Sequence, residues 1–213
     1  MADDGLFDEN GMIDEFRKTD SETWGYVIYR TVYTPSSDED FPLAMEKLDR
    51  YIREDLYRSP HPTEGRRQVA DAIMTGYQNN VLQDPEAFNQ ATSDDLRRHF
   101  LARLDNHDRR LAGWGPDNRS FVMIDEEVLS NIINAPDDSY DGERFGPEWQ
   151  KQRLKVVDAT FSPRPAPPAA NTGRGRGRDH TGQDSGYPGW IWITMRKLWF
   201  LWHRTVHSGN LIG

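Results

Sequence analysis

The feature that most constrains the fold is the stretch from Trp24 to Leu56, where a strand-like run is followed at once by a helical pattern. The run Trp24–Tyr33 is rich in β-branched and aromatic residues, and successive side chains of a strand point to opposite faces of its sheet. One face carries Trp24, Tyr26, Ile28, Arg30 and Val32, and the other carries Val27, Tyr29, Thr31 and Tyr33. Because both faces are largely apolar, the pattern predicts an interior strand that is covered at least partly on both sides.

A helix is predicted over Phe41–Leu56, because apolar residues recur there at helical spacing. Ser37 or Asp38 suits the N-cap, and Pro42 is tolerated where it falls in the first turn. The acidic residues ahead of Phe41 favour the positive end of a helix. Strand and helix together predict a sheet with helices laid across it.

Strands and helices alternate along the rest of the chain. The expected strands lie near Thr75–Gln83 and at 120–125, 153–161 and 190–194, and the expected helices at 93–111, 126–135 and 196–206. Long, variable loops join these elements, which favours an α+β fold. We therefore predict a ferredoxin-like sandwich, with a mostly antiparallel sheet and helices on one face. A doubly wound α/β sheet is the alternative, weakened by the lack of a glycine-rich turn between strand and helix.

The chain divides by composition into four parts. Residues 1–22 carry eight acidic residues against two basic ones and are predicted to be a flexible segment. Residues 23–161 are expected to form the α+β body. Residues 162–188 are rich in proline, glycine and arginine and predict a disordered linker. Residues 189–213 hold four of the seven tryptophans and are expected to dock on the body, with a partner or a membrane surface as the other destinations.

Charge and cysteine content exclude several classes of protein. The formal net charge of −9 argues against a general nucleic-acid binder, which needs clustered lysine and arginine. The chain has no cysteine, which excludes disulfides, thiolate nucleophiles and iron–sulfur clusters. The sequence shows no secretory signal and no apolar run long enough to span a bilayer, so we expect a cytoplasmic protein without membrane contact.

Few side chains suggest chemistry. Arg30 places a charge on an interior strand and needs a carboxylate, for which Asp125 and Asp158 stand at the ends of two other strands. The favoured interpretation is an internal ion pair, and the alternative is an arginine that anchors a ligand. Tyr29 and Tyr33 would line the opposite face and, if that face is open, form a binding surface with Arg30 nearby.

No catalytic residue, metal site or cofactor is predicted. Motifs for nucleotide binding, zinc proteases and serine hydrolases are missing from the sequence. His203 and His207 stand four residues apart, as metal-binding histidines on a helix do, but no third ligand accompanies them. The arginines and glycines of 173–178 lack a flanking strand and helix, so they are expected to form plain linker rather than a phosphate or RNA contact.

Several segments together resemble a group of uncharacterised proteins from filamentous fungi. These segments are Trp24–Thr31, Leu82–Phe100, Phe121–Leu129, Leu154–Asp158 and Gly189–Ile193. Each is a secondary-structure pattern rather than a catalytic motif. The resemblance therefore implies an intracellular fungal setting and no particular activity.

Two functions fit these observations. The first is a non-catalytic protein-interaction module, which could self-associate through a sheet face or the tryptophan-rich end. The second is a cofactor-free small-molecule enzyme, or a ligand-binding protein, with a pocket near Arg30. A deep pocket at Arg30 would favour the second, and a flat apolar surface would favour the first.

Overall fold

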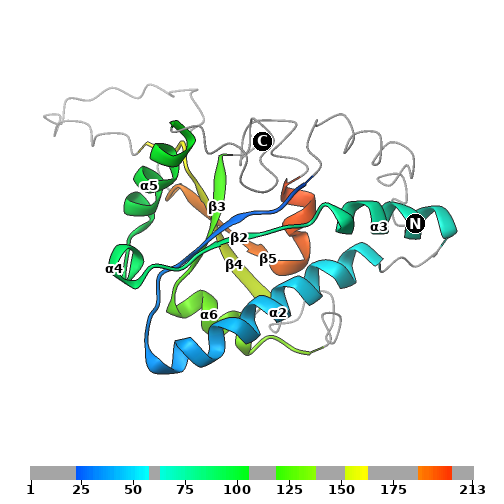
Figure 1. Cartoon of the computed structure of the whole chain (residues 1–213), viewed down its shortest axis with the longest axis horizontal. Helices are drawn as coiled ribbons and strands as arrows, with labels where there is room; N and C mark the ends of the chain where they lie inside the picture. The colour runs from blue at the N-terminus through cyan, green and yellow to red at the C-terminus, as the bar shows by residue number, and fades with distance from the viewer. Residues whose placement is uncertain (1–22, 58–62, 106–118, 138–151, 163–186, 203–213) are drawn as a thin grey trace, which may run out of the picture.

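A five-stranded mixed sheet forms the centre of the computed structural model, which describes residues 23–57, 63–105, 119–137, 152–162 and 187–202 (Figure 1). The strands are β1 (Val27–Arg30), β2 (Asn80–Leu82), β3 (Ser120–Ile124), β4 (Arg153–Asp158) and β5 (Trp190–Thr194). Their order in the sheet is β2-β1-β3-β4-β5, so β1 pairs on both sides, as the two-sided apolar pattern predicts. The acidic segment 1–22 and nearly all of the predicted linker lie outside the described residues.

The sheet is mixed, which corrects the prediction of a mostly antiparallel, ferredoxin-like sheet. β1 runs parallel to both β2 and β3, whereas β4 is antiparallel to β3 and to β5. Parallel neighbours need a crossover connection, and the helices between β1 and β2, and between β2 and β3, supply it. The helices predicted in these connections are therefore parts of crossovers between parallel strands.

Helices pack on both faces of the sheet, not on one as predicted. The helices are α2 (Pro35–Tyr57), α3 (Glu64–Thr75), α4 (Pro85–Phe88), α5 (Ser93–Asp105) and α6 (Glu126–Ile133). Buried residues of α2, α3 and α6 pack with Ile28, Val122 and Val156 on one face. On the opposite face, α4 and α5 pack against Tyr29 and Phe121. The two crossovers thus lie on opposite faces, as in a doubly wound sheet.

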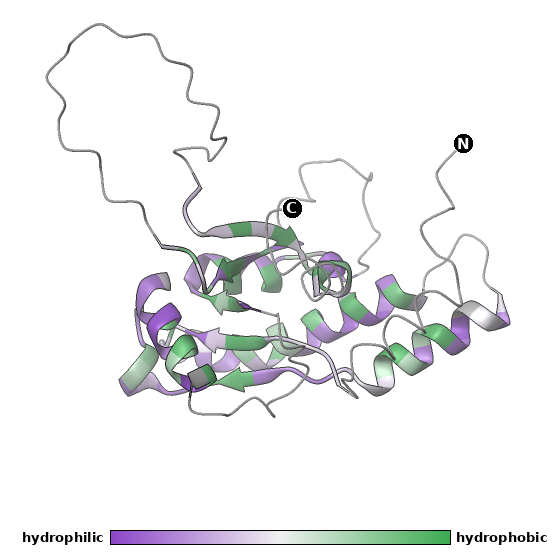
Figure 2. Cartoon of the chain, turned by 90° about the horizontal axis from the view of Figure 1, so that it is seen from above, coloured by the Kyte–Doolittle hydropathy of each residue, from purple (hydrophilic) through white to green (hydrophobic). Residues whose placement is uncertain are grey.

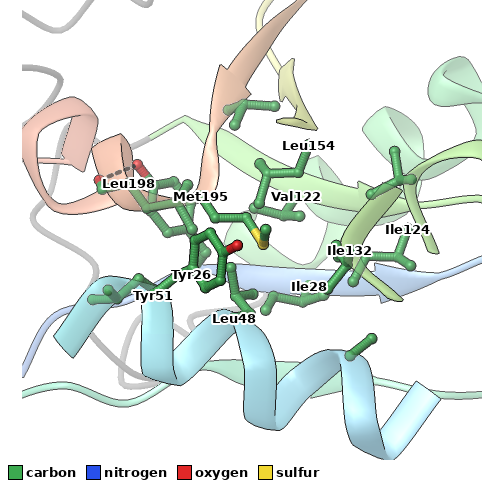
Figure 3. Packing of buried hydrophobic residues seen from close by; sticks show 14 of the residues in the cluster. Tyr26, Ile28, Leu48, Tyr51, Val122, Ile124, Ile132, Leu154, Met195 and Leu198 are labelled. Atoms are coloured by element: carbon green, nitrogen blue, oxygen red, sulfur yellow. Dashed lines mark hydrogen bonds between the residues drawn. The ribbon is translucent and has the colours of Figure 1, made fainter. Parts of the chain in front are cut away.

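The larger core lies between α2, α6 and the sheet. Figure 3 shows Tyr26, Ile28, Leu48, Val122 and Met195 directed toward one another in this space. All five are buried, at 1% exposure or less. Burying one large apolar side chain contributes about 1.5–3 kcal/mol, so this layer is a main source of stability.

The tryptophan-rich end pairs with the body in the described residues. β5 adds to β4 over five residue pairs, from Arg153–Thr194 to Val157–Trp190, and the 3₁₀ turn Met195–Lys197 follows. Helical residues 198–202 then place Trp199 and Trp202 in the core. Figure 2 shows β5 as the outermost strand, pale and green by turns as tryptophan and isoleucine alternate.

Helix α2 begins six residues before the predicted start. Thr34 and Ser37 bond reciprocally, with the Thr34 N–H donating to Ser37 Oγ (2.7 Å) and the Ser37 N–H donating to Thr34 Oγ1 (3.2 Å). This exchange caps the first turn near Pro35. Pro42 therefore lies inside the helix rather than in its first turn, which corrects that prediction. No helix in the described ranges is long and apolar enough to cross a membrane.

Candidate functional site

Arg30 lies at the carboxyl end of β1 and is only 6% exposed. Its Nε donates to the Val32 carbonyl (2.8 Å), and Nη1 donates to Gln83 Oε1 (3.3 Å). Nη2 donates to Ser37 Oγ (3.0 Å) and forms an ion pair with Asp38. All three guanidinium nitrogens are therefore bound by groups of the chain itself.

Two aromatic rings hold the same guanidinium. Its central carbon lies 4.6 Å from the Tyr33 ring centroid and 4.8 Å from that of Phe41. The Tyr33 hydroxyl donates to the Arg30 carbonyl (3.0 Å) and accepts from the Asp84 N–H (2.9 Å). Burial is the main cause that raises the pKa of Tyr33. Arg30 and Tyr33 thus tie β1 to the start of α2 and to the loop after β2.

The carboxylate partner of Arg30 is Asp38, so the predicted partners Asp125 and Asp158 are wrong. Asp125 binds Lys155 and caps α6 through the Val128 N–H (3.0 Å). The Asp158 carboxylate accepts from Thr160. Asp38 is close because the chain turns directly from β1 into α2, which brings a residue only eight positions away beside Arg30.

This cluster lies at the carboxyl ends of the parallel strands β1 and β2. Open α/β sheets bind ligands at the carboxyl ends of their strands, at a switch point that falls between β1 and β3 in this strand order. The helices after β1 and β3, α2 and α6, lie on the same face, so the two connections do not diverge there. Four of the five N–H donors of Arg30 are already bound, by Val32, Ser37, Asp38 and Gln83. A ligand would have to displace these bonds, so the geometry supports a structural role for Arg30.

Tyr29 lies on the opposite face and has no exposed surface. Its ring packs edge-on against Phe88, His99 and Phe121, with centroids 5.1–5.6 Å away. Its hydroxyl is 2.8 Å from His99 Nδ1. The binding surface predicted for Tyr29 and Tyr33 is therefore closed over Tyr29 by α4 and α5. His99 stands beside the apolar residues Leu96 and Phe100 in its helix, so no local sequence pattern indicates its pairing with Tyr29.

The pair of Tyr29 and His99 is neutral. Burial raises the pKa of Tyr29 well above its usual value, so its hydroxyl stays protonated. The hydroxyl and His99 Nδ1 share one hydrogen bond, in which the tautomer of the imidazole decides the donor. Burial, and secondly the Arg103 cation, lower the pKa of His99, while Asp84 opposes this shift.

Neutral His99 predicts that the protein loses stability in mild acid. Because the folded pKa is below the unfolded value of about 6.5, stability is fully present above that pH and falls as pH drops through the folded pKa. Replacing His99 with glutamine keeps an acceptor for Tyr29 and removes the titration. Urea unfolding at several pH values between 5 and 7.5 is expected to show a smaller acid-induced loss for His99→Gln than for the natural chain. Equal losses in both proteins would contradict this assignment.

Cations and tryptophans alternate on one side of β4 and β5. Arg153 lies 4.4 Å from the Trp192 ring centroid, and the Lys155 ammonium lies 5.0 Å from that of Trp190 and 5.5 Å from that of Trp192. The two indole rings meet edge to face at 5.5 Å. We call Arg153, Lys155, Trp190 and Trp192 the cation–tryptophan row. Both tryptophans are only partly buried, so the row reaches the surface.

The outer edge of β5 presents backbone hydrogen-bonding groups. The Asp158 N–H donates to the Gly189 carbonyl (2.9 Å), which makes this a hydrogen-bonded pair of the β4–β5 ladder. Because such pairs alternate in an antiparallel ladder, Ile191 and Ile193 bond toward β4. The N–H and C=O groups of Trp190 and Trp192 and the N–H of Thr194 point away from β4. Thr194 is 6% exposed and is the N-cap of the 3₁₀ turn Met195–Lys197, so its carbonyl accepts the first bond of that turn. In the described part of the chain, β5 pairs with β4 alone.

The described residues contain no group of three histidine, aspartate or glutamate side chains that could hold a metal ion. His203 and His207 lie outside those residues, as do the arginines and glycines of 173–178. Comparisons with protein-family models, with curated proteins and with solved structures each found no match to this chain. The resemblance to fungal proteins therefore stays a prediction, and the site must be interpreted from its own geometry.

Proposed function

We propose that this chain is a non-catalytic protein-interaction module, acting in the cytoplasm of a fungal cell, that binds an extended segment of a partner protein along β5. The observation that carries the proposal is the outward row formed by the backbone groups of Trp190 and Trp192 and the N–H of Thr194, on a strand that pairs with β4 alone among the described elements. Adding a strand to such an edge satisfies these groups and gives affinity through the main chain.

The composition of β5 supports this role. Proteins usually protect an edge strand with charges, proline or a bulge, because an unprotected edge pairs with other chains. The sequence WIWIT contains no charge and no proline, and its five residues pair with β4 in unbroken register. β5 thus has none of these protective features within its own residues.

The cation–tryptophan row supports it further. Arg153 and Lys155 hold Trp190 and Trp192 from the β4 side, which limits the rotamers that the two rings can adopt. Large aromatic side chains that are already ordered lose little entropy on binding and are enriched at interfaces. The row would contact the side chains of an added strand on one face.

Thr194 offers a test at the level of one backbone donor. Its φ of −75° already suits proline, and its N–H points away from β4, so Thr194→Pro removes an outward donor without breaking the β4–β5 ladder. Peptides selected from a displayed library of random heptapeptides against the full chain are expected to be apolar and extended. We expect Thr194→Pro to weaken their binding about tenfold, measured by fluorescence anisotropy, because roughly one hydrogen bond of about 1.4 kcal/mol is lost.

The matched control is Thr194→Val, which keeps the N–H and the shape of the side chain. It is expected to bind the selected peptides as the natural chain does. Recovery of no peptides, or equal binding by the proline variant, would show that the edge of β5 is not the docking element. Near-ultraviolet circular dichroism of both variants confirms that the tryptophan environment is kept.

A further inference from the structure

Strand β5 is complementary to itself. In an antiparallel pair of two β5 strands with a two-fold axis at Trp192, Trp190 lies opposite Thr194 of the other copy and Ile191 lies opposite Ile193. Trp192 lies opposite its own equivalent. Every residue of the strand then has an uncharged partner of suitable size, and aromatic and β-branched cross-strand pairs of this kind stabilise sheets.

We propose that the segment that binds β5 is β5 of a second copy of this chain, paired antiparallel about Trp192. This inference rests on the proposed function and names its partner. Two five-stranded sheets would join into one continuous sheet across the axis. A closed two-fold pair also leaves neither β5 edge open, which ends further growth by this edge.

The backbone groups match in this register. The outward groups of each strand are the N–H and C=O of Trp190 and Trp192 and the N–H of Thr194, because the Thr194 carbonyl is used by the 3₁₀ turn that follows. With the axis at Trp192, the two Trp192 residues exchange both bonds, and the Thr194 N–H of each strand donates to the Trp190 carbonyl of the other. A shift of one residue would place outward groups opposite inward ones and lose these bonds.

The charges at β5 do not oppose a second copy at this place. The chain has a formal net charge of −9, so two copies repel one another over much of their surface. The strand itself is uncharged, and the neighbouring cations are already balanced, Arg153 by Glu127 and Lys155 by Asp125. Association through β5 is therefore expected to strengthen with added salt, which screens the general repulsion.

Introduced cysteines can report the register, because the chain contains none of its own. In a hydrogen-bonded antiparallel pair the Cα atoms are about 5.5 Å apart, within the range that a disulfide bridges. Oxidised W192C is expected to form a covalent dimer. W190C is the matched control, because its equivalent would lie about 13 Å away along the strand, at about 3.3 Å per residue.

A second pair of variants keeps Trp192, so it tests the same register if W192C fails to fold. An equal mixture of W190C and T194C is expected to cross-link, since these positions face each other, whereas neither alone does so. The unmodified full chain is expected to sediment as a monomer–dimer equilibrium, and Thr194→Pro to raise its dimer dissociation constant at least tenfold. Equal cross-linking of W190C and W192C, or a monomer at all concentrations, would overturn the inference. If the chain stays monomeric while selected peptides still bind β5, only the second copy is excluded and the proposed function stands.

Discussion

Replacing Trp24 with alanine is expected to lower the free energy of unfolding by about 4 kcal/mol, as large-to-small changes of buried aromatic residues do. Trp24 has no exposed surface. Its Nε1 donates to the Ile73 carbonyl over 2.6 Å, so alanine also removes the partner of a buried acceptor. Both losses act at one position.

The position matters because Trp24 joins three segments that are far apart in sequence. Its ring lies 4.7 Å from Tyr77, 4.7 Å from Trp199 and 5.8 Å from Trp202, measured between centroids. It thus connects the start of β1 to the end of α3 and to helical residues 198–202. The cavity that Trp24→Ala leaves would lie between the tryptophan-rich end and the body, and the surrounding rings are too rigid to fill it.

Urea denaturation followed by circular dichroism measures this change. Trp24→Phe is expected to cost about half as much, because it keeps the ring packing and loses the hydrogen bond. Leu43, which is 56% exposed on α2, provides the control, and Leu43→Ala is expected to change stability by less than about 0.5 kcal/mol. A loss below about 1 kcal/mol for Trp24→Ala would contradict the packing of the C-terminal tryptophans against β1.

Local patterns predicted the faces of β1 well. Trp24, Tyr26 and Ile28 lie in the larger core, and Val27 and Tyr29 lie in the smaller one, as strict alternation requires. The direction of the neighbouring strands was not predictable in the same way. The direction depends on whether the helices between two strands return the chain to the same end of the sheet. The sequence interpretation started a strand at Thr75, whereas α3 extends to that residue.

At the candidate site, too, local sequence predicted some features and not others. The sequence identified Arg30 as a buried charge in need of a partner, and Arg30 is buried with one. It did not identify Asp38, because two strand-end carboxylates looked equally suitable and only the tight turn into α2 decides between them. The edge position of β5 is a property of strand order, which no local pattern of WIWIT contains.

The structural role of Arg30 leads to a prediction about its partner. Asp38→Ala is expected to destabilise the protein by about 2 kcal/mol, because a guanidinium that is nearly buried loses its carboxylate. The value is below that of a fully buried pair, since the Asp38 side chain is 64% exposed and water partly replaces it. Arg30→Met is expected to cost only about 1 kcal/mol, because the buried charge itself is removed and methionine fills the space between Tyr33 and Phe41.

A double-mutant cycle separates this pairing from other effects of Asp38. In the Arg30→Met background, Asp38→Ala is expected to cost about 0.5 kcal/mol, the share that an acidic residue in the first turn of a helix contributes through the helix dipole. Glu39→Ala, at the exposed acidic residue that follows Asp38 in α2, is the control for general charge effects. If Asp38→Ala costs the same in both backgrounds, the two side chains do not depend on each other. Arg30 would then be a buried cation without a necessary internal partner, which is the condition that a ligand-anchoring arginine must meet.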